Sequence, residues 1–191
     1  LRVNTTACWN SAFGHCALFA NSTGRGNTAL GQAALRQTNT GCYNTASGYE
    51  AMRANTTGNE NAAYGSWALY ANTTGTKNVA VGPRALQTNT TASYNTAVGA
   101  CTLFANTTGA YNTGVGFKAL KSNTCGHNNT ASGTYALASN TTGGCNTAVG
   151  DNVLASNTTG PYNTGTGKDA LAANTTAVSY THLRAHETGR N

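Results

Sequence analysis

The chain has 191 residues, of which only 8% are charged and 23 are glycine, with a formal net charge of +6. This composition is unlike that of an ordinary globular domain, and its strictly phased apolar residues exclude a disordered chain. No apolar run approaches the about 20 residues that would cross a bilayer, so we predict no membrane span. Lysine and arginine do not form a stripe interleaved with aromatic residues, so we predict no nucleic-acid partner.

A 17-residue unit repeats without insertion from Asn10 to Ser179, after a partial unit. Its consensus is N-T-A-V-G-x-x-A-L-x-x-N-T-T-G-x-x, and we number its positions 1 to 17 from the first asparagine. A constant period of this kind indicates a solenoid, in which each unit forms one coil. We predict a repeat domain over residues 1–177 and a tail outside it over 178–191. Leu1 falls at position 9, so we expect the chain to be a fragment.

Within each unit, positions 1–4 are predicted to form a short strand that ends at the glycine of position 5. Positions 8–13 are predicted to form a second strand that ends at the Thr-Gly of positions 14–15. Glycine at 5 and 15 is expected to supply the positive φ of each turn. A helix is disfavoured because glycine and paired threonine flank the A-L segment. We therefore predict an all-β fold, a β-roll-like β-solenoid of ten coils with two strands per coil.

Stacked coils place equal positions about 4.8 Å apart, which lets asparagine side chains hydrogen-bond along the rod. Position 12 is asparagine in every unit but one, where Thr38 replaces it. Loss of one ladder member should leave both neighbours unpaired, at about 1–3 kcal/mol if they are buried. The predicted ladder at position 1 is Asn10, Asn27, Asn44, Asn61, Asn78, Asn95, Asn112, Asn129, Asn146 and Asn163.

Position 9 is the predicted core stripe, formed by Leu18, Leu35, Met52, Leu69, Leu86, Leu103, Leu120, Leu137, Leu154 and Leu171. Position 4 is mostly apolar but variable, and two readings stay open: an interface between protomers, or a loosely packed core position. Burial of one leucine per coil contributes little free energy compared with the conformational entropy lost when a whole coil is ordered. We therefore predict self-association into a homo-oligomer or filament.

Charged residues in the units fall only at positions 6, 7, 10, 16 and 17, which we expect to face solvent or turn. Catalysis needs unlike residues brought together once, whereas a repeat presents the same residues in every copy. We find no paired carboxylates, nucleophile–base pair or phosphate loop, and predict no enzyme activity, cofactor or metal. His182 and His186 have the spacing of helical metal ligands, but they lie in the tail, where we expect no site.

The six cysteines suggest no intrachain disulfide framework. Cys8 and Cys42 lie two coils apart, about 9–10 Å, which is beyond the about 7 Å that a disulfide spans. Free thiols and interchain links both stay open. N-x-[ST] sequons also recur, and an asparagine–threonine ladder explains them better than glycosylation does. The less favoured glycosylation sites are Asn55, Asn72, Asn106, Asn140 and Asn157.

The N-T-A-V-G-x-x-A-L-x-x-N-T-T-G-x-x units resemble the repeats of bacterial and phage fibre proteins, including tail fibres that carry a self-cleaving chaperone domain. They are similar, more loosely, to the shorter A-x-A-x-G-x-x-S-x-A coils of trimeric autotransporter adhesin heads. The resemblance covers residues 1–177 and implies a structural fibre or adhesin shaft. It places the shaft outside the cell, on a cell surface or a virion, and leaves any receptor or glycan open. Residues 179–191 resemble translated sequencing-adapter read-through, for which no native structure is expected.

A second function is considered, namely ice binding by the threonine columns at positions 13 and 14. Threonine columns on a flat face can order water, and the pair recurs in most units. Against this reading, adjacent residues on a strand point to opposite faces. Threonines before a turn glycine also tend to bond the backbone. The intact pairs are Thr56/Thr57, Thr73/Thr74, Thr90/Thr91, Thr107/Thr108, Thr141/Thr142, Thr158/Thr159 and Thr175/Thr176.

Overall fold

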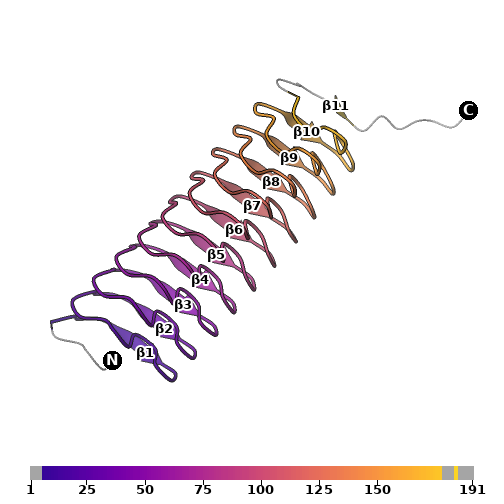
Figure 1. The fold of residues 1–191 in the computed structure, drawn as a ribbon. Coiled ribbons are helices and arrows are strands. Elements are labelled where there is room, and N and C mark those ends of the chain that lie inside the picture. The colour runs from indigo at the N-terminus through magenta and orange to yellow at the C-terminus, as the bar shows by residue number, and fades with distance from the viewer. Residues whose placement is uncertain (1–5, 178–182, 185–191) are drawn as a thin grey trace, which may run out of the picture.

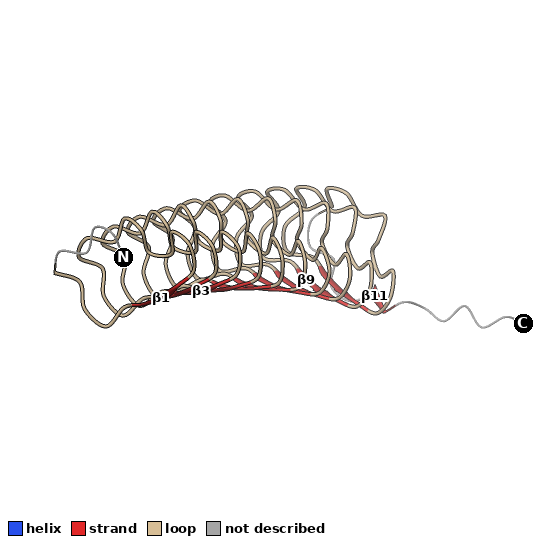
Figure 2. Cartoon of the chain, turned by 90° about the horizontal axis from the view of Figure 1, so that it is seen from below, coloured by secondary structure: helices blue, strands red, loops and turns tan. Residues whose placement is uncertain are grey.

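The computed structural model describes residues 6–177 and 183–184, and they form a rod of stacked coils (Figure 1). One short parallel strand from each coil joins a single sheet along one side of the rod (Figure 2). Each strand pairs with the next at an offset of one unit, as in Thr96 opposite Thr113. The strands are β1 (Ser11–Phe13), β2 (Thr28–Leu30), β3 (Thr45–Ser47), β4 (Ala62–Tyr64), β5 (Val79–Val81), β6 (Thr96–Val98), β7 (Thr113–Val115), β8 (Thr130–Ser132), β9 (Thr147–Val149) and β10 (Thr164–Thr166).

These strands confirm the predicted all-β solenoid, and the described residues contain no helix. A further strand, β11 (Leu183–Arg184), pairs with β10 through Gly165 opposite Leu183. That offset is 18 residues (183 − 165), so β11 does not continue the 17-residue period. His182 and His186 lie outside the described residues, as does the rest of the tail after Ala177 apart from Leu183–Arg184.

The prediction of two strands per coil is wrong, because positions 6–11 form turns. Residues at positions 7 and 9 adopt left-handed backbone conformations, as in Cys101 (φ 56) and Leu103 (φ 51). The chain nevertheless keeps bonding between coils there, with Leu103 N donating to Ala119 O (3.0 Å) and Ala105 N to Lys121 O (2.9 Å). A left-handed leucine costs about 1–2 kcal/mol, and it is held in place by these bonds and by its burial.

Glycine recurs at positions 5 and 15 of the unit for two different structural reasons. Gly99, at position 5, has a φ of 130, and an added Cβ would lie 2.6 Å from Gly116 O in the next coil. The predicted positive φ at position 15 is wrong. Glycine is favoured there by close approach, because a Cβ on Gly109 would lie 2.4 Å from Gly126 O and 2.6 Å from Asn106 Oδ1, although Ala92 occupies the same position in another coil. The left-handed residue of that turn is at position 17, as in Tyr111 (φ 59).

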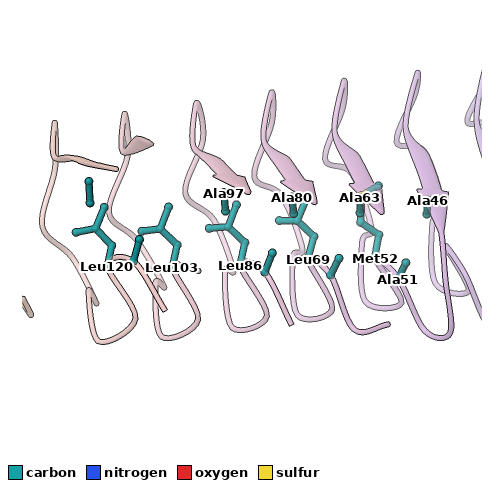
Figure 3. Packing of buried hydrophobic residues seen from close by; sticks show 14 of the residues in the cluster. Ala46, Ala51, Met52, Ala63, Leu69, Ala80, Leu86, Ala97, Leu103 and Leu120 are labelled. Atoms are coloured by element: carbon teal, nitrogen blue, oxygen red, sulfur yellow. The ribbon is translucent and has the colours of Figure 1, made fainter. Parts of the chain in front are cut away.

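The position-9 side chains form one apolar core along the rod, packed against alanines at positions 3 and 8 (Figure 3). Leu18 to Leu154 are fully buried, and Leu171 is partly buried. Position 8 is larger than alanine at Thr102 and Val153, and glycine replaces alanine at position 3 of the following coil, at Gly114 and Gly165. A Cβ on Gly165 would lie 2.6 Å from Val153 Cγ1, so the two positions exchange volume between coils.

Candidate functional site

The position-1 asparagines form a buried hydrogen-bonded column along the rod. At every step from Asn27 to Asn163, the backbone N–H donates to the Oδ1 of the preceding column member, at 2.8–3.0 Å. Asn61 shows the full pattern, because its Nδ2 also donates to Asn44 Oδ1 (3.1 Å) and to Gly75 O (2.8 Å). The predicted ladder residues thus lie in one column, and the side-chain amides hold the backbone as well as each other.

The position-12 asparagines form a second buried column. Asn72 Nδ2 donates to Asn55 Oδ1 (2.8 Å) and to Gly75 O (3.0 Å). Gly75 O therefore accepts from Asn61 and from Asn72, and the two columns share one position-15 carbonyl in most coils, but not in the coil of Thr38. Sequence reasoning missed this shared acceptor, because a backbone carbonyl leaves no sequence signal beyond the fixed spacing of positions 1, 12 and 15.

The second column has one interruption, at Thr38. Thr38 is fully buried, and its Oγ1 has no hydrogen-bond partner. The Oδ1 of Asn21, which faces it from the preceding coil, has none either. Asn55 Nδ2, on the other side, keeps its bond to Gly58 O (3.0 Å). The single departure from asparagine at position 12 therefore leaves two buried oxygen atoms unsatisfied.

The sequon asparagines of the NTT segments belong to this second column. The five less favoured glycosylation sites among them are fully buried, and the Nδ2 of each, the atom that a glycan would modify, donates a hydrogen bond of 2.9–3.0 Å to the position-15 carbonyl. A glycan on the folded rod would have to displace these bonds. The residues concerned are Asn55, Asn72, Asn106, Asn140 and Asn157.

The threonines at positions 13 and 14 point to different surroundings. Position-13 hydroxyls donate to the position-13 carbonyl of the next coil, at 3.0–3.1 Å, in Thr56, Thr73, Thr90, Thr107, Thr124, Thr141 and Thr158. Position-14 threonines such as Thr57 and Thr108 are exposed. The pair therefore does not present two columns of free hydroxyls on one surface.

The outer face of the sheet carries the side chains of positions 2 and 4, whereas position 3 points into the core. The interpretation of position 4 as a loosely packed core position is wrong, because its apolar side chains are exposed. The relative exposures are Phe13 77%, Leu30 48%, Tyr64 45%, Val81 36%, Val98 36%, Val115 40% and Val149 41%. No residue of β1–β10 is charged. The sheet therefore presents a continuous uncharged face with an apolar column.

Cations and aromatic rings are interleaved on the turns, mostly between coils, although Lys118 also lies over the neighbouring Phe117. Arg84 lies over Trp67, 5.3 Å from the ring centroid, and Lys77 lies 5.5 Å from that of Tyr94. Sequence reasoning missed these contacts, because the partners are 17 residues apart and only alignment of successive units would have shown them. They are distributed over several turn positions, so the prediction of no nucleic-acid partner stays a prediction.

The densest polar cluster on the turns is internally paired. Trp67 Nε1 donates to Glu50 Oε2 (3.1 Å), and Arg53 Nη1 donates to Tyr70 OH (2.6 Å). Arg53 Nε lies 3.6 Å from Glu50 Oε1. The charged and aromatic groups of this cluster thus contact each other across adjacent coils. Such contacts stabilise the stacking of variable side chains, and they do not hold a nucleophile beside a base.

All six cysteines carry free thiols in the structure. Within residues 6–177 and 183–184, no three His, Cys, Asp or Glu side chains are grouped closely enough to hold a metal ion. The described part of the chain also has no helix of the length and apolarity needed to cross a membrane.

Comparisons with protein-family models, with curated proteins and with solved structures found no match to this chain.

Proposed function

We propose that the repeat domain is a structural rod, the shaft of an extracellular fibre or adhesin on a cell surface or a virion. One observation carries this proposal: the same buried hydrogen bonds join each coil to the next from Asn10 to Asn163. The residues that recur in every unit are therefore those that join one coil to the next, and each added unit lengthens the rod. The resemblance of the repeat to fibre proteins supports the same role and the extracellular location.

A catalytic role has less support, because the invariant residues of the unit are used within the rod. The asparagine amides bond the backbone and each other, and the position-9 side chains fill the core. The variable residues differ from coil to coil and do not converge on one site. We propose that the domain catalyses no reaction and needs no cofactor or metal.

The proposal is tested by changing the length of the rod in whole units. Deleting residues 95–145 removes three complete units and joins position 17 directly to position 1. We expect this variant to keep its β circular dichroism and its cooperative unfolding. Small-angle X-ray scattering should show a rod shortened by about 14 Å, at about 4.8 Å per coil. The matched control deletes residues 95–137, which removes about two and a half units.

The control should lose the folded signal downstream of the junction, because asparagine and glycine columns no longer align. An unshortened particle, or unfolding of the whole-unit variant, would contradict a modular shaft. Ice binding at positions 13 and 14 has less support, because the position-13 hydroxyls donate to backbone carbonyls. Thermal hysteresis of the purified repeat region, abolished by Thr→Ala in three successive NTT segments, would replace the shaft proposal.

A further inference from the structure

We propose that the outer face of sheet β1–β10 binds a second copy of this chain, face to face and with the two rods antiparallel. This inference rests on the proposed structural role and specifies the surface through which the shaft associates. The face is the pair of columns formed by the outward side chains of positions 2 and 4. In the middle coils, away from both ends of the rod, every position-4 side chain from Tyr64 to Val115 has a relative exposure of at least 36%.

The chemistry of this face fits an uncharged partner. Positions 2 and 4 of the ten strands carry only hydroxyl, methyl, aliphatic and aromatic groups. All charged side chains of the described repeats lie on the turns, at positions 6, 7, 10, 16 and 17. A charged partner would bury its charges against this face without counterions, which is costly. The exposed apolar stretch of position 4 from Tyr64 to Val115 is of the kind that marks protein–protein contact sites.

The periodicity of the face matches that of another copy. A second rod presents the same rungs at the same spacing of about 4.8 Å, so contacts made at one coil recur at all of them. The face is about 43 Å long and about 12 Å wide, from nine strand spacings and two outward side chains. Contact over the whole of both faces would bury about 1,000 Å² in total, which is the area that a biological interface needs and lies just below the about 1,200 Å² of standard stable interfaces.

Symmetry distinguishes the antiparallel from the parallel arrangement. A two-fold axis along the strands makes the rods antiparallel and sets column 4 of one copy on column 4 of the other. A two-fold axis along the rod makes them parallel and sets column 4 on column 2. Column 2 is mostly threonine, as in Thr96 and Thr113, whereas column 4 is mostly apolar, as in Val98 and Val115. The antiparallel dimer therefore buries apolar groups on apolar groups, which is the more favourable pairing.

Side-chain size supports the same arrangement. In the full antiparallel register the largest position-4 side chains face smaller ones, which suits close packing. A parallel dimer would place the two copies of each bulky residue in the same rung. The antiparallel pairs are Phe13 with Thr166, Leu30 with Val149, Ser47 with Ser132, Tyr64 with Val115, and Val81 with Val98.

Sedimentation equilibrium of the native chain at micromolar concentrations tests the surface. We expect twice the chain mass for the native chain and for Thr91→Lys/Thr108→Lys, the matched control on exposed position-14 threonines. Val81→Lys/Val98→Lys should sediment as a monomer with unchanged β circular dichroism, because lysine ammonium groups would be buried at the centre of the interface. A native monomer that is still a rod, or a dimer that survives the lysine variant, would overturn the inference and leave the shaft proposal standing. A monomer that is not a rod would overturn both.

Orientation is tested by electron-spin distance measurement on singly labelled chains in which the six cysteines are replaced by serine. A label at Lys168→Cys, in the last unit, should give a distance above about 40 Å in an antiparallel dimer, since the labels lie at opposite ends. The matched label at Ala100→Cys, in the sixth unit, should give a much shorter distance. Equal short distances from both labels would overturn the antiparallel arrangement. Thermal hysteresis of the Thr91→Lys/Thr108→Lys chain, lost in Val81→Lys/Val98→Lys, would identify ordered water as the occupant and overturn the second copy.

Discussion

The region around Thr38 and the region around Val153 both depart from the repeat inside the rod, but only the second is compensated. Val153 replaces alanine at position 8, and Gly165 gives up a methyl group in the next coil to make room. Thr38 replaces asparagine in the position-12 column, and two buried oxygens lose their partners. A packing change involves one pair of side chains, so one further substitution restores it. A ladder member serves the coils on both sides, so no single change elsewhere restores its bonds.

The largest effect is expected from a new interruption of the intact position-1 column. Asn95→Ala removes the acceptor of Asn112 N (2.9 Å) and the donor to Gly109 O (2.9 Å). The buried Asn112 N–H then lacks a partner, while Gly109 O keeps the bond from Asn106 Nδ2, so the unfolding free energy should fall by about 2–4 kcal/mol. Urea unfolding followed by far-ultraviolet circular dichroism measures the change.

The control for that change is Asn106→Ala in the position-12 column. Asn106 Oδ1 accepts from a side chain, Asn123 Nδ2 (2.9 Å), and not from a backbone N–H. We expect a smaller loss, about 2–3 kcal/mol, because Asn123 can reorient its amide whereas a backbone N–H cannot. Equal losses at Asn95 and Asn106 would show that the two columns hold the backbone equally.

The compensated site should behave as a coupled pair. Gly165→Ala places a Cβ 2.6 Å from Val153 Cγ1 and should cost about 1–3 kcal/mol through overpacking. Val153→Ala alone leaves a cavity and should cost about 1–2 kcal/mol. The double variant returns to the alanine pair of the other coils and should lie within about 1 kcal/mol of the native chain. Additive losses in this double-mutant cycle would refute the exchange of volume between coils.

Restoring asparagine at the uncompensated site, Thr38, should stabilise the protein. Thr38→Asn supplies a donor to Asn21 Oδ1 and an acceptor for Asn55 Nδ2, and should raise the unfolding free energy by about 1–2 kcal/mol. Thr38→Val deletes the unpaired hydroxyl but leaves Asn21 unpaired, so its gain should be smaller, below about 1 kcal/mol. A Thr38→Asn variant no more stable than Thr38→Val would mean that the interruption carries no cost.

No effect is expected from passage through a glycosylating secretory pathway. Asn72 and Asn106 are fully buried, and their Nδ2 atoms donate to carbonyls. Tryptic peptides covering the NTT segments should therefore show no glycan mass in mass spectrometry. Detection of the same peptides at their unmodified mass serves as the internal check on recovery. A glycan on these asparagines would show that modification precedes stacking of the coils.

The residues that the unit repeats most strictly were interpretable without the fold. Asn10 to Asn163 and the position-9 stripe stand at a constant interval, and stacking at constant spacing brings each set into one column. Sequence reasoning missed the exchange of volume between Thr102 or Val153 and the glycine of the following coil, although alignment of successive units shows both substitutions.

The conformation within a coil was not predictable in the same way. Left-handed backbone at Leu103 is unfavourable for the isolated residue, and local propensity therefore predicted a strand where the chain turns. Glycine recurs at position 15 as it does at position 5, so the sequence predicted a positive φ at both. At position 15 the structure shows instead a close approach of the carbonyl of the next coil.

The sequence by itself determined the period, the all-β class and the columns, because these depend only on which residues recur at equal intervals. Only the tertiary structure decided that each coil has one strand, that position 4 faces outward, and that two asparagine columns share a carbonyl. Those features depend on how a coil closes on itself, and closure is fixed by hydrogen bonds and contacts between neighbouring coils rather than by preferences of single residues.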